Sequence, residues 1–211
     1  MIRINPFTFI TKVLPVLFLI LIIGGYMFLG KDRTPPENAV KISFPLKNGL
    51  YFITQNGPSG IYHQQPLEKY AMDIIKGMPS LGVFTKVNLT DFPIFGDSIY
   101  SPCVGRIKEL HDGNIDNNPG STSPTANSIV VGCDGFDVYI AHIKNGSFRV
   151  TQEQIVGVTD IIAEVGNTGN STEPHMHILA YREDKDGSMI PLPLLLDGRY
   201  YLKNDTIHTE N

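Results

Sequence analysis

The sequence predicts a mainly β domain preceded by one apolar N-terminal helix, and three observations support this fold class. Twenty glycines and fifteen prolines punctuate the chain, a density that favours short strands and turns over long helices. From Gly49 onward, short apolar runs recur between turn signals, and none keeps a 3.6-residue period long enough for a helix. Residues 13–29, by contrast, form one uninterrupted apolar run.

Seven of the short runs have the length and composition of β-strands, namely residues 50–54, 70–75, 105–110, 128–133, 136–142, 161–165 and 175–181. Asp134-Gly135 lies between two of them, and an Asp-Gly pair is typical of the type I′ turn of a β-hairpin. Residues 111–127 consist almost entirely of Asn, Asp, Gly, Ser, Thr and Pro. This composition predicts a long surface loop.

The apolar run at residues 13–29 has basic residues on both sides. As a helix, with a rise of about 1.5 Å per residue, it reaches roughly 26 Å, near the lower limit for spanning a bilayer. A cleaved signal peptide has a shorter apolar region and a small-x-small cleavage site, which Gly24-Gly25 followed by Tyr26 does not provide. We therefore expect a single-pass membrane anchor with the domain outside the cytoplasm. A cleaved signal peptide, which would leave the domain secreted, and a buried core helix are the alternatives.

These features divide the chain into four segments. Residues 1–30 are the expected membrane anchor or signal segment, and residues 31–48, with Pro35-Pro36 and mixed charges, are the expected linker. Residues 49–200 are the expected domain, and residues 201–211 are a polar tail that we expect to be frayed.

Charge and cysteine content restrict the function classes. A formal charge of -4, with charged residues at 18%, argues against a nucleic-acid-binding protein, which usually has a clustered basic face. Cys103 and Cys133 are the two cysteines, and they form no CxxC pair. In an exported domain two such cysteines are more typical of a disulfide than of a metal site. Two buried free thiols remain the alternative.

Histidines supply the candidate chemistry. His175 and His177 form an H-x-H pair, and because residues i and i+2 of a strand face the same way, both imidazoles would lie on one side with Leu179 and Tyr181. His142 ends the run at residues 136–142. On an alternating strand it would share a face with Phe136, Val138 and Ile140. Two further histidines belong to no motif and are expected to be solvated, His111 and His208.

Three motifs follow one another along the chain. His63 precedes Tyr70-Ala71-Met72-Asp73, then comes Ala141-His142-Ile143, and residues 166–177 read GNTGNSTEPHMH. In this order, over residues 49–182, they resemble the lysostaphin-type, or LytM-type, zinc endopeptidases of cell walls. The similarity is to the branch in which a longer insert separates the first histidine from Tyr-Ala-x-Asp.

This resemblance implies a small antiparallel β-sheet domain with a barrel-like sandwich form. It also implies that His63, Asp73 and His177 bind zinc and that His142 and His175 act in catalysis. Three N/O ligands leave a fourth tetrahedral position for water, as catalytic zinc sites do. Zinc lowers the pKa of that water and polarises the scissile carbonyl. The implied function is hydrolysis of peptide bonds in peptidoglycan stems or cross-bridges.

Two other function classes stay open. One is a catalytically inert relative that binds the wall or a partner protein as a scaffold or activator; whether an active enzyme needs an activator also stays open. The other is a carbohydrate-binding β-module without metal, which the absence of Trp disfavours. The chain departs from the more familiar family members because nine residues, rather than three, separate His63 from Asp73. This makes His63 the ligand that most needs testing.

Overall fold

The computed structural model describes residues 13–29, 33–57, 63–78 and 88–210. The chain divides into two compact units, Met1–Thr34 and Pro35–Asn211. In the first unit, α2 (Leu14–Leu29) is the helix that the apolar run predicts. The second unit is mainly β, as predicted, and the helical segments among its described residues are the short 3-10 helices η2 (Pro66–Tyr70) and η4 (Leu89–Asp91).

The predicted membrane anchor is wrong. α2 has 16 residues, which at about 1.5 Å per residue give roughly 24 Å, less than the ~30 Å hydrocarbon core of a bilayer. Across the part of the chain that the structure describes, none of the helices is both long enough and apolar enough to cross a membrane. The location outside the cytoplasm was derived from this anchor and is not supported.

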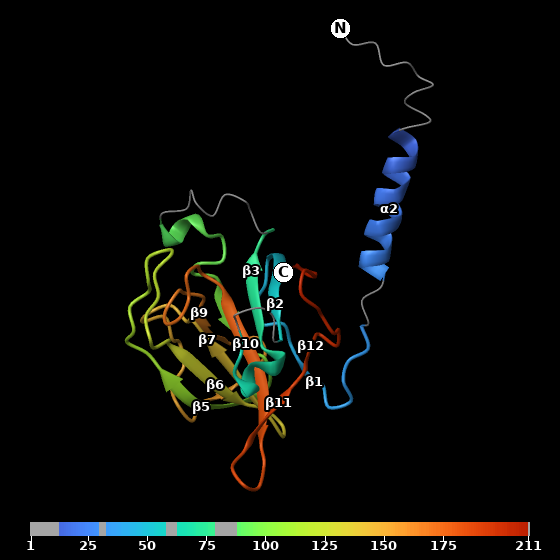
Figure 1. The fold of residues 1–211 in the computed structure, drawn as a ribbon. Helices are drawn as coiled ribbons and strands as arrows, with labels where there is room; N and C mark the ends of the chain where they lie inside the picture. The colour runs from blue at the N-terminus through green and yellow to red at the C-terminus, as the bar shows by residue number, and fades with distance from the viewer. Residues whose placement is uncertain (1–12, 30–32, 58–62, 79–87, 211) are drawn as a thin grey trace. The chain divides into compact units, whose positions relative to one another are not determined.

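The described residues of the second unit form thirteen strands, arranged as Figure 1 shows. They are β1 (Val40–Ile42), β2 (Gly49–Asn56), β3 (Met72–Lys76), β4 (Ser98–Tyr100), β5 (Gly105–His111), β6 (Ser128–Gly132), β7 (Asp137–Ala141), β8 (Ile155–Val156), β9 (Ile161–Glu164), β10 (Met176–Glu183), β11 (Met189–Leu192), β12 (Leu194–Leu196) and β13 (Thr206–Thr209). All seven predicted runs overlap a strand.

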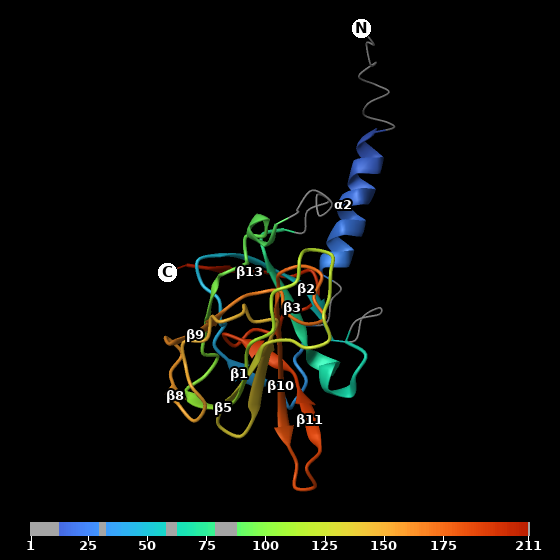
Figure 2. The ribbon, with the colours of Figure 1, turned by 90° about the vertical axis from the view of Figure 1, so that its left-hand side faces the viewer.

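One nine-stranded antiparallel sheet dominates the unit. Its strand order is β13-β2-β3-β10-β7-β6-β5-β8, with β11 paired to β10 beyond the point where β3 ends. Figure 1 shows β3, β10, β7, β6 and β5 following one another across the sheet, and Figure 2 shows the β10–β11 hairpin extending from one end. Two smaller sheets pair β4 with β9 antiparallel and β1 with β12 parallel.

The main core lies between the nine-stranded sheet and the two smaller sheets. Alternate residues of β7 and β10, such as Val138, Ile140 and Ile178, are fully buried in one apolar cluster. The same cluster includes Ile42 of β1 and Ile162 of β9. Because strand residues alternate between faces, this packing explains why β7 carries β-branched residues two positions apart, at Val138 and Ile140. The sandwich arrangement that the resemblance implied is therefore consistent with the core.

A second, smaller apolar cluster lies on the other face of the large sheet. Ala71, Val130, Leu179 and Tyr181 are buried there, with Leu67 and Tyr139 packed against them. Because Leu179 and Tyr181 alternate with the core residues Ile178 and Ala180 along β10, this cluster occupies the face opposite the main core. This second face carries the candidate site.

Cys103 and Cys133 form a disulfide, as predicted. The adjoining β6–β7 connection is the predicted hairpin at Asp134-Gly135, but its turn is not the expected type I′. The backbone N–H of Cys133 donates to the carbonyl of Phe136, at 2.8 Å, on the two sides of this dipeptide. A type I′ turn needs positive φ at both central residues. Gly135 has φ +81°, but Asp134 is not among the described residues with positive φ.

Two segments expected to lie outside the domain contribute strands to it. β1 falls within the expected linker and pairs with β12, with Val40 opposite Leu194. β13 falls within the expected polar tail and pairs with β2, with Ile207 opposite Tyr51. Both strands are short, and their partners lie far away along the chain. Local composition therefore gave no sign of them.

The loop at residues 112–127 is long and lacks strands, as predicted, but it is closely attached to the domain. Asn117 Nδ2 donates to the carbonyl of Gly169, and the N–H of Asn167 donates to Asp116 Oδ1 at 2.6 Å. Asn127 Nδ2 donates to the carbonyl of Ile143 at 3.2 Å. These hydrogen bonds hold the loop against the Gly/Asn-rich turn at residues 166–174.

Substitution of Gly169 tests this attachment. Gly169 has φ +78°, and a Cβ there would lie 2.5 Å from Ala126 Cβ and 2.7 Å from Ala126 Cα. Gly187 has φ +83° with nothing within 4 Å, so Gly187→Ala is a matched control for the backbone strain of about 1–2 kcal/mol. We expect Gly169→Ala to lower the free energy of unfolding by about 1–3 kcal/mol more than the control does. Urea unfolding measures both, and equal losses would contradict the packing.

Candidate metal centre

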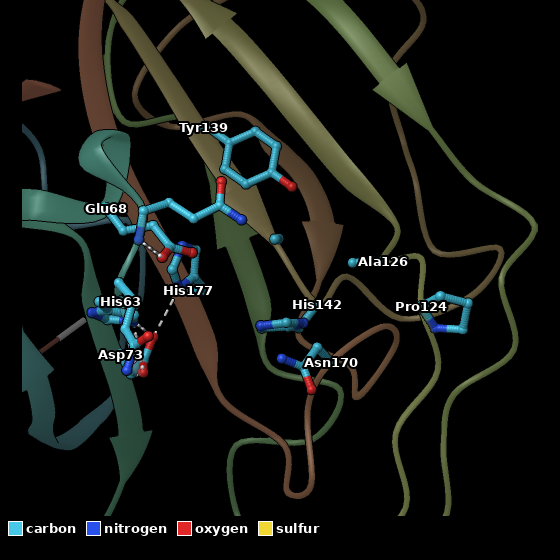
Figure 3. A pocket seen from close by; sticks show the side chains of 12 residues that line it. His63, Glu68, Asp73, Pro124, Ala126, Tyr139, His142, Asn170 and His177 are labelled. Atoms are coloured by element: carbon cyan, nitrogen blue, oxygen red, sulfur yellow. Dashed lines mark hydrogen bonds and ion pairs between the residues drawn. The ribbon is translucent and has the colours of Figure 1, made fainter. Parts of the chain in front are cut away.

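β10 brings the candidate site together because it is paired on both sides. His177 lies opposite Asp73 of β3 and opposite Ala141 of β7. Side chains of directly opposed residues have Cβ atoms about 4.5–5.5 Å apart, so the register places the Asp73 carboxylate beside the His177 imidazole. His142 follows Ala141 directly and enters the same region from the end of β7 (Figure 3).

His63, Asp73 and His177 converge. His177 Nδ1 lies 2.9 Å from Asp73 Oδ1, and His63 Nε2 lies 3.2 Å from the same oxygen and 3.1 Å from Oδ2. One ligand atom of each residue lies within 4.8 Å of the others. His63 and His177 are buried, with exposed fractions of 8% and 7%. The three residues that the motifs singled out as ligands are therefore neighbours in space.

This arrangement fits a zinc ion. Two imidazole nitrogens and a carboxylate oxygen are the donor types that zinc takes in catalytic sites, and ligands at about 2.0–2.2 Å in a tetrahedron lie roughly 3.4 Å apart. The separations of His63 and His177 from Asp73, 2.9 to 3.2 Å, are close to that value, and one ligand atom of each of the three residues lies within 4.8 Å of the others. These three side chains could therefore hold the metal with only small movements.

Two of the site histidines have left-handed backbone conformations. His63 has φ +54° and His142 has φ +61°, a region that costs a residue with a side chain about 1–2 kcal/mol. At His142 this conformation ends the alternation of β7. Val138 and Ile140 face the core, whereas His142 lines the site cavity. The expectation that His142 shares a face with Val138 and Ile140 is therefore wrong.

Backbone carbonyls orient His142 and His175, the two motif histidines that are not candidate ligands. His142 Nδ1 lies 2.7 Å from the carbonyl oxygen of Thr168, and His175 Nδ1 lies 2.8 Å from that of Glu173. A carbonyl oxygen only accepts hydrogen bonds, so Nδ1 carries the proton in both rings and Nε2 of a neutral ring keeps its lone pair. Both carbonyls belong to the Gly/Asn-rich turn. Its residues thus fix the tautomers, a role that the sequence did not reveal.

His142 and His175 lie next to the three converging residues. The ring centroids of His142 and His175 are 4.6 Å apart, and those of His142 and His177 are 5.7 Å apart. His175 Nε2 lies 3.6 Å from Asp73 Oδ1. All five motif residues are therefore grouped around one carboxylate. His111 and His208 are exposed elsewhere, as predicted.

The site opens into a cavity of about 560 Å³. His63, Asp73 and His177 line one side of it, and Pro124 and Ala126 of the 112–127 loop line the opposite side (Figure 3). The loop therefore borders the cavity, as expected. The other lining residues are Gln64, Gln65, Glu68, Tyr139, Ala141, His142 and Asn170.

Tyr139 is a lining residue that the sequence reading missed. It alternates with the fully buried Val138 and Ile140, so strand geometry alone places it on the site face. Its ring centroid lies 6.4 Å from that of His177. The alternation of β7 could have placed Tyr139 on the site face. It did not, because the alternation was assumed to extend to His142, which would have put that histidine on the opposite face from Tyr139.

Burial and mutual charge perturb the site residues. Burial would raise the pKa of Asp73, but the charge of His175 and hydrogen bonds from His177 and His63 hold it well below its ordinary range. Burial lowers the pKa of His63, and its hydrogen bond and charge interaction with Asp73 more than offset this and raise it. Burial, with the charges of His175 and His177, lowers the pKa of His142 to about 3. His142 is therefore neutral at pH 7.

The depressed pKa of His142 predicts a loss of stability in acid. The unfolded chain binds a proton at His142 near the ordinary histidine pKa of 6.5, whereas the folded protein does so only near a pKa of about 3. Stability therefore falls as pH drops through this window, by at most about 1.4 kcal/mol per pH unit from this residue. We expect His142→Gln to weaken the pH dependence of the free energy of unfolding between about pH 6.5 and pH 4.5.

Urea unfolding of chelator-treated protein at several pH values measures this change. His111→Gln is the matched control, because His111 has an exposed side chain, at 66%. An unchanged slope in His142→Gln would show that the folded protein protonates His142 without penalty.

Comparison with known proteins identifies the fold family. Residues 89–188 match the model of Peptidase family M23. His142, His175 and His177 lie within this segment, whereas His63 and Asp73 precede it. No curated protein matches the sequence.

Three solved structures show related folds. The antimicrobial peptidase lysostaphin from Staphylococcus simulans has 19% identity and a TM-score of 0.42, over 64% of this chain and 43% of that one. A zinc containing peptidase from Vibrio cholerae has 15% identity and a TM-score of 0.44, over 81% of this chain and 41% of that one. A mutant of the catalytic domain of the prophage-encoded M23 protein EnpA from Enterococcus faecalis has 16% identity and a TM-score of 0.43, over 66% and 87%.

This chain spans less than half of the length of the lysostaphin and Vibrio cholerae chains. Because all three TM-scores lie below 0.5, the assignment rests on the sequence match and on the ordered motifs that the match contains. Residues 89–188, just under half of the chain, match peptidase family M23, the lysostaphin and LytM type that the motifs resemble.

Proposed function

We propose that this protein is a zinc-dependent endopeptidase that hydrolyses peptide bonds in peptidoglycan stems or cross-bridges. The observation that carries the proposal is the convergence of His63, Asp73 and His177 at the wall of a cavity that His142 also lines. The match to peptidase family M23 supports the reaction class. The inert scaffold is disfavoured, because the full set of candidate ligands and both further histidines are present.

In this proposal His63, Asp73 and His177 hold the metal. When bound, zinc would act as a Lewis acid. It would polarise the scissile carbonyl and lower the pKa of water, so that hydroxide is available as the nucleophile near neutral pH. The low pKa of Asp73 keeps its carboxylate negative, and its hydrogen bonds hold the imidazoles of His63 and His177 close to it. The chain thus presents a charged carboxylate and two imidazoles before any metal arrives.

His142 is suited to move a proton. Its Nδ1 proton is committed to the carbonyl of Thr168, so Nε2 has a free lone pair at neutral pH. We assign it to accepting a hydrogen bond from an attacking water and to passing the proton of that water to the leaving amine. Its depressed pKa favours release of this proton over its retention. His175 is held in the same way by the carbonyl of Glu173 and presents Nε2 toward the reaction centre. We assign it to hydrogen bonding with the substrate's developing charge.

Zinc stoichiometry tests the ligand assignment. We expect the full-length protein to retain about one zinc per chain after dialysis, as a three-ligand site implies. His63→Ala and Asp73→Ala each remove one ligand and should abolish or greatly weaken retention, whereas His208→Ala, an exposed histidine on β13, should not. Inductively coupled plasma mass spectrometry on protein of known concentration measures the number of zinc ions per chain. Undiminished binding by His63→Ala would mean that a ligand has been misplaced, and a zinc-free wild type would remove the basis of the proposal.

Hydrolysis of purified peptidoglycan tests the roles of the remaining histidines. We expect His142→Ala and His175→Ala to keep their zinc but to release new amino termini roughly 10²–10⁴-fold more slowly, the usual effect of losing a proton-transfer group at His142 and a hydrogen bond to the developing charge at His175. His111→Ala is the control and should retain the wild-type rate. Zinc-loaded wild-type protein that binds wall but releases no new amino termini would favour the scaffold reading instead.

A further inference from the structure

A second cavity, of about 380 Å³, adjoins the cavity of the candidate metal centre. We call it the side cavity. Four residues line both spaces, namely Gln65, Glu68, Tyr139 and His177. A peptide held at the metal centre therefore has the side cavity as its immediate neighbour.

The floor of the side cavity is apolar. Val130, Leu179 and Tyr181 line it and have exposed fractions of 4%, 3% and 8%. They belong to the second apolar cluster, on the sheet face opposite the main core. Leu67 from η2 and Met189 from β11 complete the apolar lining. Such a surface favours contact with a hydrocarbon chain over contact with water.

The polar lining of the side cavity is acidic. Glu68 from η2 and Glu109 from β5 both line it, and no lysine or arginine does so among the residues that the structure describes. Both carboxylates lie near Tyr139: burial raises the pKa of the Tyr139 phenol, and the negative charges of Glu68 and Glu109 raise it further. A group that enters the side cavity therefore meets negative charge above an apolar floor.

Neither carboxylate is fully used by the protein itself. Glu68 Oε2 accepts the backbone N–H of Gln65 at 3.1 Å, and Glu109 Oε2 lies 3.7 Å from Nε2 of the exposed His111. A carboxylate has about four acceptor positions. Both groups therefore keep acceptor capacity for a ligand with N–H donors.

We propose that the side cavity binds a substrate side chain with an aliphatic stem that ends in a primary ammonium group, as in the diamino acids of wall peptides. The stem would lie over Val130 and Leu179, and the ammonium group would reach Glu68 and Glu109. The position of the substrate backbone in this proposal rests on the proposed function. η2 forms part of the long insert between His63 and Asp73, so the insert supplies both Leu67 and Glu68 to this subsite.

Two wall stem peptides that differ at one nitrogen provide the test. In one the side-chain amine of the diamino residue is free, and in the other it is acetylated. Calorimetry measures the binding of each to the full-length, chelator-treated protein, and hydrolysis of each is followed separately with zinc-loaded protein. We expect the free amine to bind roughly 10-fold more tightly, as contacts with two partly exposed carboxylates allow.

The double variant Glu68→Gln, Glu109→Gln should lose this preference, because it removes both charges and keeps both side-chain shapes. Glu183→Gln is the matched control, since Glu183 is an exposed carboxylate on β10 that does not line the side cavity; it should keep the preference. Equal binding of the two peptides to the wild type, binding of neither, or a preference that survives in the double variant would overturn the proposal. Preferential binding without hydrolysis would instead count against the proposed endopeptidase activity alone.

Discussion

The two-sided pairing of β10 is the constraint on which the rest of the structure depends. One register buries Met176 and Ile178 in the main core and places His177 opposite both Asp73 and Ala141. A slip of one residue would turn every side chain of β10 to the other face, which would bury His177 among aliphatic residues and remove it from Asp73. The free energy of core packing therefore maintains the geometry of the candidate metal centre.

The side chains of the site have few conformations available to them, because neighbouring backbone groups hold them in place. The carbonyls of Thr168 and Glu173 orient the two imidazoles that are not candidate ligands, and the 112–127 loop is fastened to the same turn through Asn117. Rigid support of this kind reduces the reorganisation that a reacting site needs. Its electrostatic consequence is that Asp73 stays charged and His142 stays neutral, because each responds to the other site histidines as well as to burial.

Sequence analysis recovered the parts of this arrangement that local pattern encodes. Short apolar runs between turn signals located β2, β6, β7 and β10, and the ordered motifs named the five residues that meet at the site. What it missed depends on contacts between distant segments or on backbone conformation. β1 and β13 exist because Val40 meets Leu194 and Ile207 meets Tyr51. The direction of His142 depends on its φ of +61°, and no residue type announces that angle.

The position of His63 explains how the unusual spacing of the first motif is tolerated. Asp73 and His177 are fixed by strand register, whereas His63 precedes η2 and belongs to no strand. The segment between Asp73, a candidate ligand fixed by register, and His63, a candidate ligand outside the strands, is free to change length, since doubling a loop adds only about 0.6 kcal/mol of closure entropy. Insertions at this point therefore leave the geometry of the candidate metal centre intact and add residues to the lining of the cavity beside it. This junction is a place where evolution could alter what the domain recognises without rebuilding the centre.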